Sequence, residues 1–364
     1  MKHLVPTIEP YEPPTQPTIA IVGDAPSQED LKWSRPFRDY KGAELQSMLV
    51  DAGIEFMNCF QTTVIIERPP LGDISKLCHK KRDVLRMAQE LGWKDYPFQP
   101  IRAGEYLSPW YTLDLFRLQS DLARLRPNVV ITLGGFATWA LTGNGAITKS
   151  RGTVVESTLV PGLKVLPTFH PGAVISDWSK RVVVLQDLLK AKRESEYPEI
   201  RRPRRLLAIA ETINDIWDFK ENHLDNAALI ACDIETNKNR FISCISFAPS
   251  PDKCLCVPFI SYNGRRHSHY WPTVQDELLA WETVNMILTS SVPKLWQNGL
   301  YDLQYLYTCG IHPKYNIHDT MLSHHSIWPE LPKSLGFMGS IFCNESAWKE
   351  LRPRGKEASG KKDS

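Results

Sequence analysis

The chain has 364 residues, of which 42% are hydrophobic and 23% charged, and its formal net charge is +2. This composition is typical of a globular protein and excludes a disordered, collagen-like or coiled-coil chain, while the length predicts two domains. No apolar run approaches the ~18 residues of a membrane span. The proline-rich segment 1–17 has no apolar stretch like that of a signal peptide. We therefore predict a cytoplasmic protein without a membrane partner, beginning with a flexible tail over residues 1–17.

The front half, residues 18–192, alternates short apolar runs with helical patterns. Strands are expected at 18–22, 56–66, 128–133 and 164–169. Leucines at 115, 118, 122 and 125 are spaced as on one face of a helix. Buried strands alternating with helices predict an α/β/α sandwich with a mostly parallel sheet. Ligands of such sheets bind at the carboxyl ends of the strands, so the polar residues that follow each strand are the candidates for a site.

A basic segment with two prolines separates the two halves, and we expect a linker over residues 193–226. Strands are then predicted at 228–234, 241–248, 253–259 and 294–297, and helices at 274–288, 300–307 and 320–327. Consecutive strands followed by alternating elements indicate a second α/β domain with a mixed sheet, over residues 227–350. Residues 351–364 are predicted to be a basic tail. Basic stretches like this tail and the linker can follow phosphates, although solvated surface is an equally good interpretation.

The cysteines give no sign of a disulfide framework or of a zinc site. The eight positions are Cys59, Cys78, Cys232, Cys244, Cys254, Cys256, Cys309 and Cys343. None forms a C-x-x-C pair, and several lie in apolar strand-like runs, which is typical of free thiols in a reducing compartment.

Polar clusters at the predicted strand ends carry the first functional signal. In chain order they are Gly23-Asp24-Ala25-Pro26, Arg35-Pro36-Phe37, Asn58, Arg68-Pro69-Pro70, Gly134-Gly135, Arg151-Gly152 and Thr168-Phe169-His170-Pro171. Each cluster alone has a plain structural interpretation, such as a turn. The ordered series resembles the uracil-DNA glycosylase superfamily, nearest to its family-4 type, over about residues 18–192.

The resemblance implies a site that cleaves the N-glycosidic bond of a flipped uracil. Asp24 would orient the attacking water, and His170 would stabilise the leaving base. Asn58 would read the edge of uracil and Phe37 would stack on it. Contacts to DNA are expected from four further residues: Arg151, Pro171, Trp178 and Arg181.

Two departures from the family pattern bear on activity and cofactors. The family usually has Glu where this chain has Asp24, and the shorter side chain puts its reach to the water in question. Family-4 members carry four cysteines for an iron–sulfur cluster, whereas this half has only Cys59 and Cys78. We therefore expect no iron–sulfur cluster and no other cofactor in the glycosylase half.

Acidic residues in the rear half carry a second signal. Asp233 and Glu235 lie two apart on a predicted strand and so share one face, where paired carboxylates are costly unless they bind cations. Asn298…Tyr301-Asp302 and Asp319-Thr320 follow. This series resembles the ribonuclease H-like 3′–5′ exonuclease domain of family-A DNA polymerases, particularly those of phages. It implies that Asp233, Glu235 and Asp302 bind Mg²⁺ or Mn²⁺.

The third motif of that exonuclease family would lie just beyond Lys349, where the chain instead continues into a basic tail. We therefore expect an impaired exonuclease, fused to the glycosylase in a split or truncated phage polymerase product within a bacterial host cell. DNA and a separately encoded polymerase fragment are the expected partners. Two alternatives remain open: a non-catalytic DNA-binding, uracil-sensing subunit of a polymerase, and an exonuclease whose front domain only recognises uracil.

Overall fold

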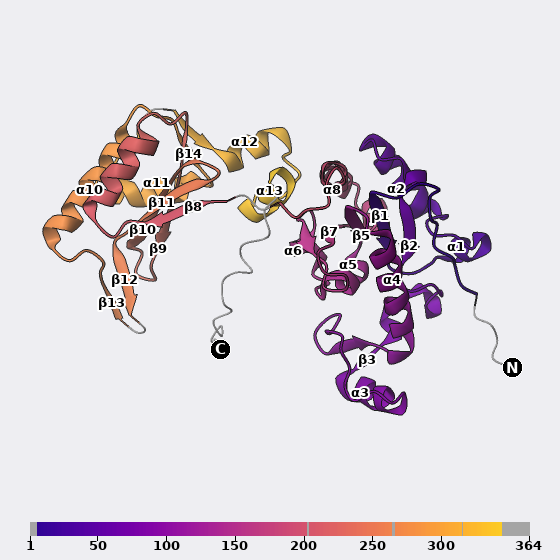
Figure 1. Ribbon diagram of the computed structural model, residues 1–364. Coiled ribbons are helices and arrows are strands. Elements are labelled where there is room, and N and C mark those ends of the chain that lie inside the picture. The colour runs from indigo at the N-terminus through magenta and orange to yellow at the C-terminus, as the bar shows by residue number, and fades with distance from the viewer. Residues whose placement is uncertain (1–5, 202–203, 264–265, 315, 344–364) are drawn as a thin grey trace, which may run out of the picture. The chain divides into compact units, whose positions relative to one another are not determined.

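The computed structural model describes residues 6–201, 204–263, 266–314 and 316–343, which form two compact units (Figure 1). Unit 1 comprises the chain up to Ile200 and again from Gly336, and unit 2 comprises Arg201–Leu335. Unit 2 is thus an insertion between two parts of unit 1. Within the described ranges no helix is both long and apolar enough to cross a membrane.

Unit 1 is built on a five-stranded sheet with the order β2-β1-β5-β7-β6. Its strands are β1 (Ile19–Gly23), β2 (Phe60–Thr63), β5 (Val129–Leu133), β6 (Val155–Glu156) and β7 (Lys164–Thr168). The first three and β7 pair in parallel, and β6 is antiparallel to β7. A separate two-stranded ribbon joins β3 (Cys78–Lys80) to β4 (Glu105–Leu107). The predicted parallel sheet is confirmed.

Helices cover both faces of this sheet, as expected for an α/β/α sandwich. They are α1 (Gln28–Trp33), α2 (Tyr40–Asp51), α3 (Lys81–Glu90), α4 (Thr112–Leu125), α5 (Gly135–Thr142), α6 (Ile147–Ser150), α7 (Pro171–Ser176) and α8 (Lys180–Glu194). Successive residues of β1 supply two different cores, because side chains alternate along a strand. Ile19 and Ile21 pack with α2, α7 and α8, whereas Ala20 and Val22 pack with α4 and α5.

Unit 2 contains a six-stranded mixed sheet with the order β15-β14-β9-β10-β11-β8. The strands are β8 (Leu206–Ile209), β9 (Ile230–Thr236), β10 (Ile242–Ser250), β11 (Lys253–Pro258), β14 (Lys294–Trp296) and β15 (Ile317–Asp319). Strand β10 is antiparallel to both neighbours, and the remaining pairs are parallel. A hairpin of β12 (Ile260–Asn263) and β13 (Arg266–His269) follows β11.

The helices of unit 2 are α9 (Ile213–Phe219), α10 (Val274–Thr289), α11 (Gly299–Thr308) and α12 (Thr320–Ile327), with a π-helical turn at Lys220–Leu224. One core joins α9, α10 and α11 to the inward-facing residues of β9, β10 and β11, among them Ile234, Ile245 and Val257. The opposite residues of β9, Asp233 and Glu235, are exposed. The mixed α/β sheet expected from the rear half is confirmed.

Two segments expected to be irregular are instead folded. In the predicted tail, Ile8 is 2% exposed and its N–H donates to the carbonyl of Ile66, while Tyr11 bridges to Gln61 beside β2. In the predicted linker, β8, α9 and the π-helical turn belong to unit 2 and bury Ile216 and Phe219. The prolines and charges of both segments are typical of irregular chain, but the few apolar residues among them are buried and fold each segment onto its unit.

The last described helix, α13 (Leu335–Phe342), packs on unit 1 although it follows unit 2 in the chain. The side chain of Ser340 accepts a hydrogen bond from Arg151, at 2.8 Å between oxygen and Nη1. The ammonium of Lys190 donates to the carbonyls of Ser340 and Cys343. The predicted exonuclease range, 227–350, therefore includes a helix of unit 1.

Candidate active site

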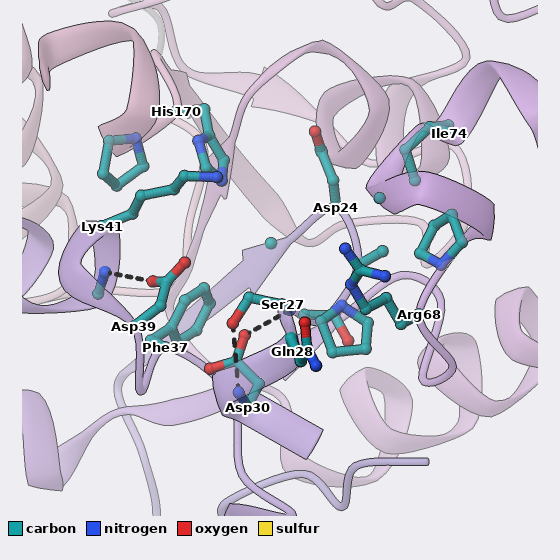
Figure 2. A pocket seen from close by; sticks show the side chains of 18 of the residues that line it. Asp24, Ser27, Gln28, Asp30, Phe37, Asp39, Lys41, Arg68, Ile74 and His170 are labelled. Carbon is teal, nitrogen blue, oxygen red and sulfur yellow. Dashed lines mark hydrogen bonds between the residues drawn. The ribbon is translucent and has the colours of Figure 1, made fainter. Parts of the chain in front are cut away.

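A pocket of about 330 Å³ opens at the carboxyl ends of β1, β2 and β7 in unit 1 (Figure 2). The first expected cluster, from Gly23 through Ser27, forms one wall, and His170 and Pro171 form another. Phe37, Lys41, Thr63 and Arg68 also line it. The pocket therefore brings together clusters that are more than 140 residues apart in the sequence, at the sheet edge where ligands of parallel sheets bind.

Asp24 follows β1 at the bottom of the pocket. Its Oδ1 accepts the N–H of Ala137 at 2.9 Å, in the first turn of α5, and the residue lines the pocket. Burial raises the pKa of Asp24 to about 7, although the Ala137 hydrogen bond opposes the rise. Gly134 (φ 97°) lies beside it, and a Cβ there would come within 3.3 Å of both Asp24 Oδ2 and His170 Cβ. A glycine is thus required between the two side chains.

His170 caps the start of α7, and its Nδ1 accepts the N–H of Gly172 at 3.0 Å. Burial, and next the charge of Lys41, lower the pKa of His170 to about 4, while Asp39 opposes that effect. The imidazole is therefore neutral at pH 7. Because Nδ1 accepts a hydrogen bond, the ring proton resides on Nε2. The side chain offers the pocket a neutral N–H donor.

The Phe37 loop forms a third wall. Asp30 holds this loop, because its two oxygens accept the N–H groups of Ser27 and Arg38. The ring of Phe37 is 8% exposed and lies so close to Gly23 that a Cβ there would come within 2.8 Å of it. A Cβ on Gly42 would come within 2.1 Å of the Phe37 carbonyl oxygen. The pocket wall therefore depends on two close backbone approaches, and stacking of Phe37 on a base stays a prediction.

Asn58 does not lie in the pocket, which contradicts its expected role in reading uracil. It belongs to a 3₁₀ turn, Phe56–Asn58, that precedes β2, and its exposed amide donates to Glu55 at 2.8 Å. Asn58 precedes β2, Asp24 follows β1, and the two strands are parallel. Asn58 therefore lies at the amino ends of the strands, whereas Asp24 lies at their carboxyl ends. The residue that reaches the pocket from β2 is Thr63, at the strand's carboxyl end. Its hydroxyl donates to the carbonyl of Ile65, so its oxygen remains available as an acceptor.

Arg151 is also misassigned as a DNA contact. It is 2% exposed, and its guanidinium forms a bidentate pair with Asp187, with nitrogen–oxygen distances of 3.0 and 2.5 Å. Asp187 in turn accepts the hydroxyl of Thr168 at 2.8 Å, two residues before His170. Through Asp187, Arg151 therefore stabilises the end of β7, the strand that precedes His170.

The other three expected DNA contacts differ in accessibility. Arg181 forms salt bridges with Glu44 and Asp51 of α2, so its charge is partly compensated, and its contact with DNA stays a prediction. Trp178 is 64% exposed and lies over that same guanidinium, at 5.3 Å. Pro171 is buried and lines the pocket beside His170. For Trp178 and Pro171, DNA contact stays a prediction.

Three pocket residues were missed as site residues: Thr63, Lys41 and Arg68. The sequence predicts one continuous strand over residues 56–66. In the structure a turn over Phe56–Asn58 comes first, and the strand ends at Thr63. Asp39 caps the start of α2, where its carboxylate accepts the N–H of Gly42. Lys41 therefore lies in the first turn of that helix. Arg68 was noted in a motif, but its contact with the pocket depends on the turn that follows it.

The three expected metal ligands of unit 2 are neighbours. Asp233 and Glu235 project from the same face of β9, and Asp302 lies in the first turn of α11. Although Asp233 is exposed, partial loss of water around its carboxyl group, and next the charges of Asp302 and Glu235, raise its pKa to about 6. Asp302 is 3% exposed, and its Oδ1 accepts the N–H of Ile234 at 3.0 Å. One of its oxygens is therefore already engaged by the β9 backbone.

Nearby Asp319 has a structural role. Its carboxylate accepts the N–H groups of Gly299 and Met321, which begin α11 and α12. Among the described residues, no three His, Cys, Asp or Glu side chains converge in a way that would hold a metal ion. The described residues of unit 2 thus do not form a metal site as they stand, and no step through a metal is derived from them.

Solved structures similar to this chain are exonuclease domains. The exonuclease domain of EXD2, solved with manganese and GMP, shows 14% identity and a TM-score of 0.25 over 34% of this chain and 61% of that domain. Escherichia coli RNase D shows 16% identity and a TM-score of 0.29 over 40% of this chain and 36% of its own. This chain therefore spans only about three fifths of the EXD2 domain. Likeness at this level assigns no activity to unit 2.

The front half matches known glycosylases by sequence. A curated relative, the type-4 uracil-DNA glycosylase of Thermotoga maritima, is 27% identical over 178 residues, which is 48% of this chain and 76% of that protein. The profile of the uracil DNA glycosylase superfamily matches residues 9–194, slightly more than half of the chain and almost all of unit 1 before the insertion. This match covers every wall of the pocket. The chain belongs to the uracil DNA glycosylase superfamily.

Proposed function

We propose that unit 1 hydrolyses the N-glycosidic bond of uracil in DNA. The observation that carries this proposal is the pairing, in one pocket, of a carboxyl group held at its bottom with a neutral imidazole N–H donor. A carboxylate can orient a water molecule toward C1′, and a neutral donor can stabilise negative charge that develops on the leaving base. A base inside a duplex cannot reach such a pocket, so the proposed reaction needs a nucleotide flipped out of the duplex.

In the proposed reaction, the Asp24 carboxylate accepts a hydrogen bond from water and holds its oxygen toward C1′. The bond between C1′ and the base breaks, and its electrons pass to the base. His170 donates its Nε2–H to the base oxygen that gains charge. Thr63, an acceptor, suits the N3–H of uracil, and Phe37 borders the base plane. Arg68 at the rim is proposed to contact a phosphate.

The direct test is an excision assay with a uracil-containing oligonucleotide in EDTA, followed by alkali. We expect strand breaks at uracil and none at thymine or cytosine, because the proposed reaction needs no metal ion. Binding without breaks would favour the alternative of a non-catalytic, uracil-sensing subunit. An oligonucleotide without uracil provides the control for contaminating nucleases.

The rate of excision should depend on pH through one group. Asp24 must be ionised to orient water, and its pKa is raised to about 7, so the single-turnover rate should rise about tenfold per pH unit below 7 and level off above it. His170, with its pKa lowered to about 4, should add no second inflection between pH 5 and 9. Rate measurements across that range test this. A profile that is flat, or that falls as pH rises through 7, would contradict the proposed role of Asp24.

For unit 2, we infer an exonuclease-like module whose metal-dependent hydrolysis is impaired. Asp233 lies close enough to Asp302 and Glu235 for their charges to raise its pKa, which supports one cluster of carboxylates. Two-metal hydrolysis, however, needs carboxylate oxygens that are free to bind both ions, and Asp302 has one oxygen engaged by Ile234.

We therefore expect the isolated chain to shorten a 5′-labelled single strand from its 3′ end, in Mg²⁺ or Mn²⁺, no faster than its Asp233→Asn variant does. Denaturing gels of the labelled strand over several hours measure this. Digestion that is abolished by EDTA and by Asp233→Asn would contradict impairment and assign unit 2 a working site.

A separately encoded polymerase fragment remains a proposed partner, resting on the sequence resemblance alone. If such a fragment supplies a further carboxylate, adding it should restore digestion that depends on Mg²⁺ and on Asp302. Digestion that survives Asp302→Asn would belong to the added fragment itself.

A further inference from the structure

The charged side chains around the pocket differ in whether they already have hydrogen-bond partners. Its acids Asp30 and Asp39 serve as backbone caps, since Asp30 accepts the N–H groups of Ser27 and Arg38, and Asp39 accepts that of Gly42. His170 is neutral. The cationic side chains in the lining are Lys41 and Arg68. In the part of the chain that the structure describes, Lys41 forms no salt bridge, and its ammonium lies over the exposed ring of Tyr40, at 5.7 Å from the ring centroid.

Lys41 lies on the His170 side of the pocket. Its Cδ is 3.5 Å from the position that a Cβ on Gly172 would occupy, and that glycine donates to the imidazole of His170. Figure 2 shows the side chain extending from α2 toward the His170 ring. Lys41 is half-buried, so its ammonium is partly shielded from water beside the imidazole. The nearby Asp39 carboxylate offsets this charge in part.

We propose that Lys41 is a catalytic residue that stabilises the departing base as an anion. This inference rests on the proposed glycosylase function. When the bond between C1′ and N1 breaks, both electrons remain with the base, and its negative charge spreads onto O2 and O4. The neutral His170 donates a hydrogen bond to that charge but carries none of its own. The ammonium of Lys41 supplies the missing charge and keeps its protons throughout.

The atoms and electrons of the step are conserved without a further reactant. The oxygen of water bonds to C1′, the Asp24 carboxylate accepts the proton that this water releases, and the base leaves as an anion that later takes a proton from solvent. A fixed charge near developing charge is worth most in a site that excludes water, where loss of one stabilising donor slows reactions by about 100- to 1000-fold.

A leaving-group comparison tests this role. We expect Lys41→Gln to lower the single-turnover excision rate of uracil by about 100-fold, with Lys41→Arg retaining part of the activity because it keeps the charge. For 5-fluorouracil, whose anion is intrinsically more stable, the loss on Lys41→Gln should be several-fold smaller. The dissociation constant for uracil-containing DNA should change by less than about threefold.

Lys32→Gln provides a matched control. Lys32 is an exposed lysine of α1 that pairs with Glu29 and does not line the pocket, so its loss should leave both rates unchanged. Circular dichroism and the melting temperature establish that Lys41→Gln is folded.

Three results would overturn the inference. Lys41→Gln could slow both bases by the same factor, or weaken DNA binding at an unchanged rate as a phosphate contact would, or have no effect. In each case a wild-type chain that excises both bases leaves the proposed function standing. A wild-type chain that excises neither base would overturn the proposed function, and this inference with it.

Discussion

Replacing Asp24 by Asn should abolish excision while making unit 1 more stable. Asparagine keeps the oxygen that accepts the Ala137 N–H, so the pocket should retain its shape. It cannot take a proton from water or stabilise positive charge at C1′, so we expect the single-turnover rate to fall by about 10²- to 10⁴-fold. The remaining activity should no longer vary with pH around 7.

The stability gain follows from the sign of the pKa change. The pKa of Asp24 rises from 3.8 to about 7 on folding, so the folded chain holds a proton that the unfolded chain has lost between these values. Stability therefore falls as pH rises through that window, and the whole penalty is present above pH 7. It amounts to at most about 4 kcal/mol for unit 1, and the Asp24→Asn variant would not incur it.

Hydrogen exchange at the amides of β1 and β5 measures this in unit 1 alone. At pH 8 the Asp24→Asn variant should show slower exchange than the wild type, and at pH 4 the two should be alike. Asp39→Asn is the comparison, since Asp39 lines the same pocket but caps Gly42 and is not proposed to act on water. An Asp24→Asn chain that excises uracil at the wild-type rate would refute the proposed mechanism.

The central strands of both units were predictable because their apolar runs are short and end in polar or glycine residues, whereas several short or outer strands, such as β6 and β8, were not. Ile19–Gly23 and Val129–Leu133 are buried throughout, and a run of that kind has few alternatives to a central strand. The order of the parallel strands was beyond reach of the same reasoning. Only the folded chain shows that β1 lies between β2 and β5, which places Thr63 beside Asp24.

The site residues were predictable where a motif directly follows a strand. The prediction failed where the end of the strand itself was predicted at the wrong position. Asp24 and His170 each follow a strand directly, so both reach the pocket. Asn58 was assigned to the wrong edge because a turn before β2 contains an aromatic residue and resembles strand. Arg151 failed for a different reason: the sequence cannot show that Asp187, 36 residues later, buries and neutralises its charge.

Residues 335–343 reveal a dependence between the halves that the sequence did not indicate. Lys190 of α8 is 1% exposed, and its ammonium has three carbonyl acceptors: Gly152 in the front half, and Ser340 and Cys343 after unit 2. Burial lowers the pKa of Lys190 to about 8. A buried ammonium that loses its acceptors is costly, so the front half alone would be left with an unsatisfied charge behind its sheet.

Ending the chain after residue 334 should therefore destabilise unit 1 by about 2–4 kcal/mol, although unit 2 keeps its whole sheet. Hydrogen exchange at β5 and β7 should accelerate accordingly, with β9 and β10 of unit 2 unchanged. In a Lys190→Met background the same truncation should cost about 1–2 kcal/mol less, because no ammonium is left without acceptors.

Lys192→Met is the matched control: Lys192 lies on the same helix but donates to the carbonyl of Gly53, so the truncation should cost as much as in the wild type. Equal costs in the Lys190→Met and Lys192→Met backgrounds would show that α13 stabilises unit 1 by packing alone, and a truncation without effect on β5 and β7 would show that unit 1 is complete without α13.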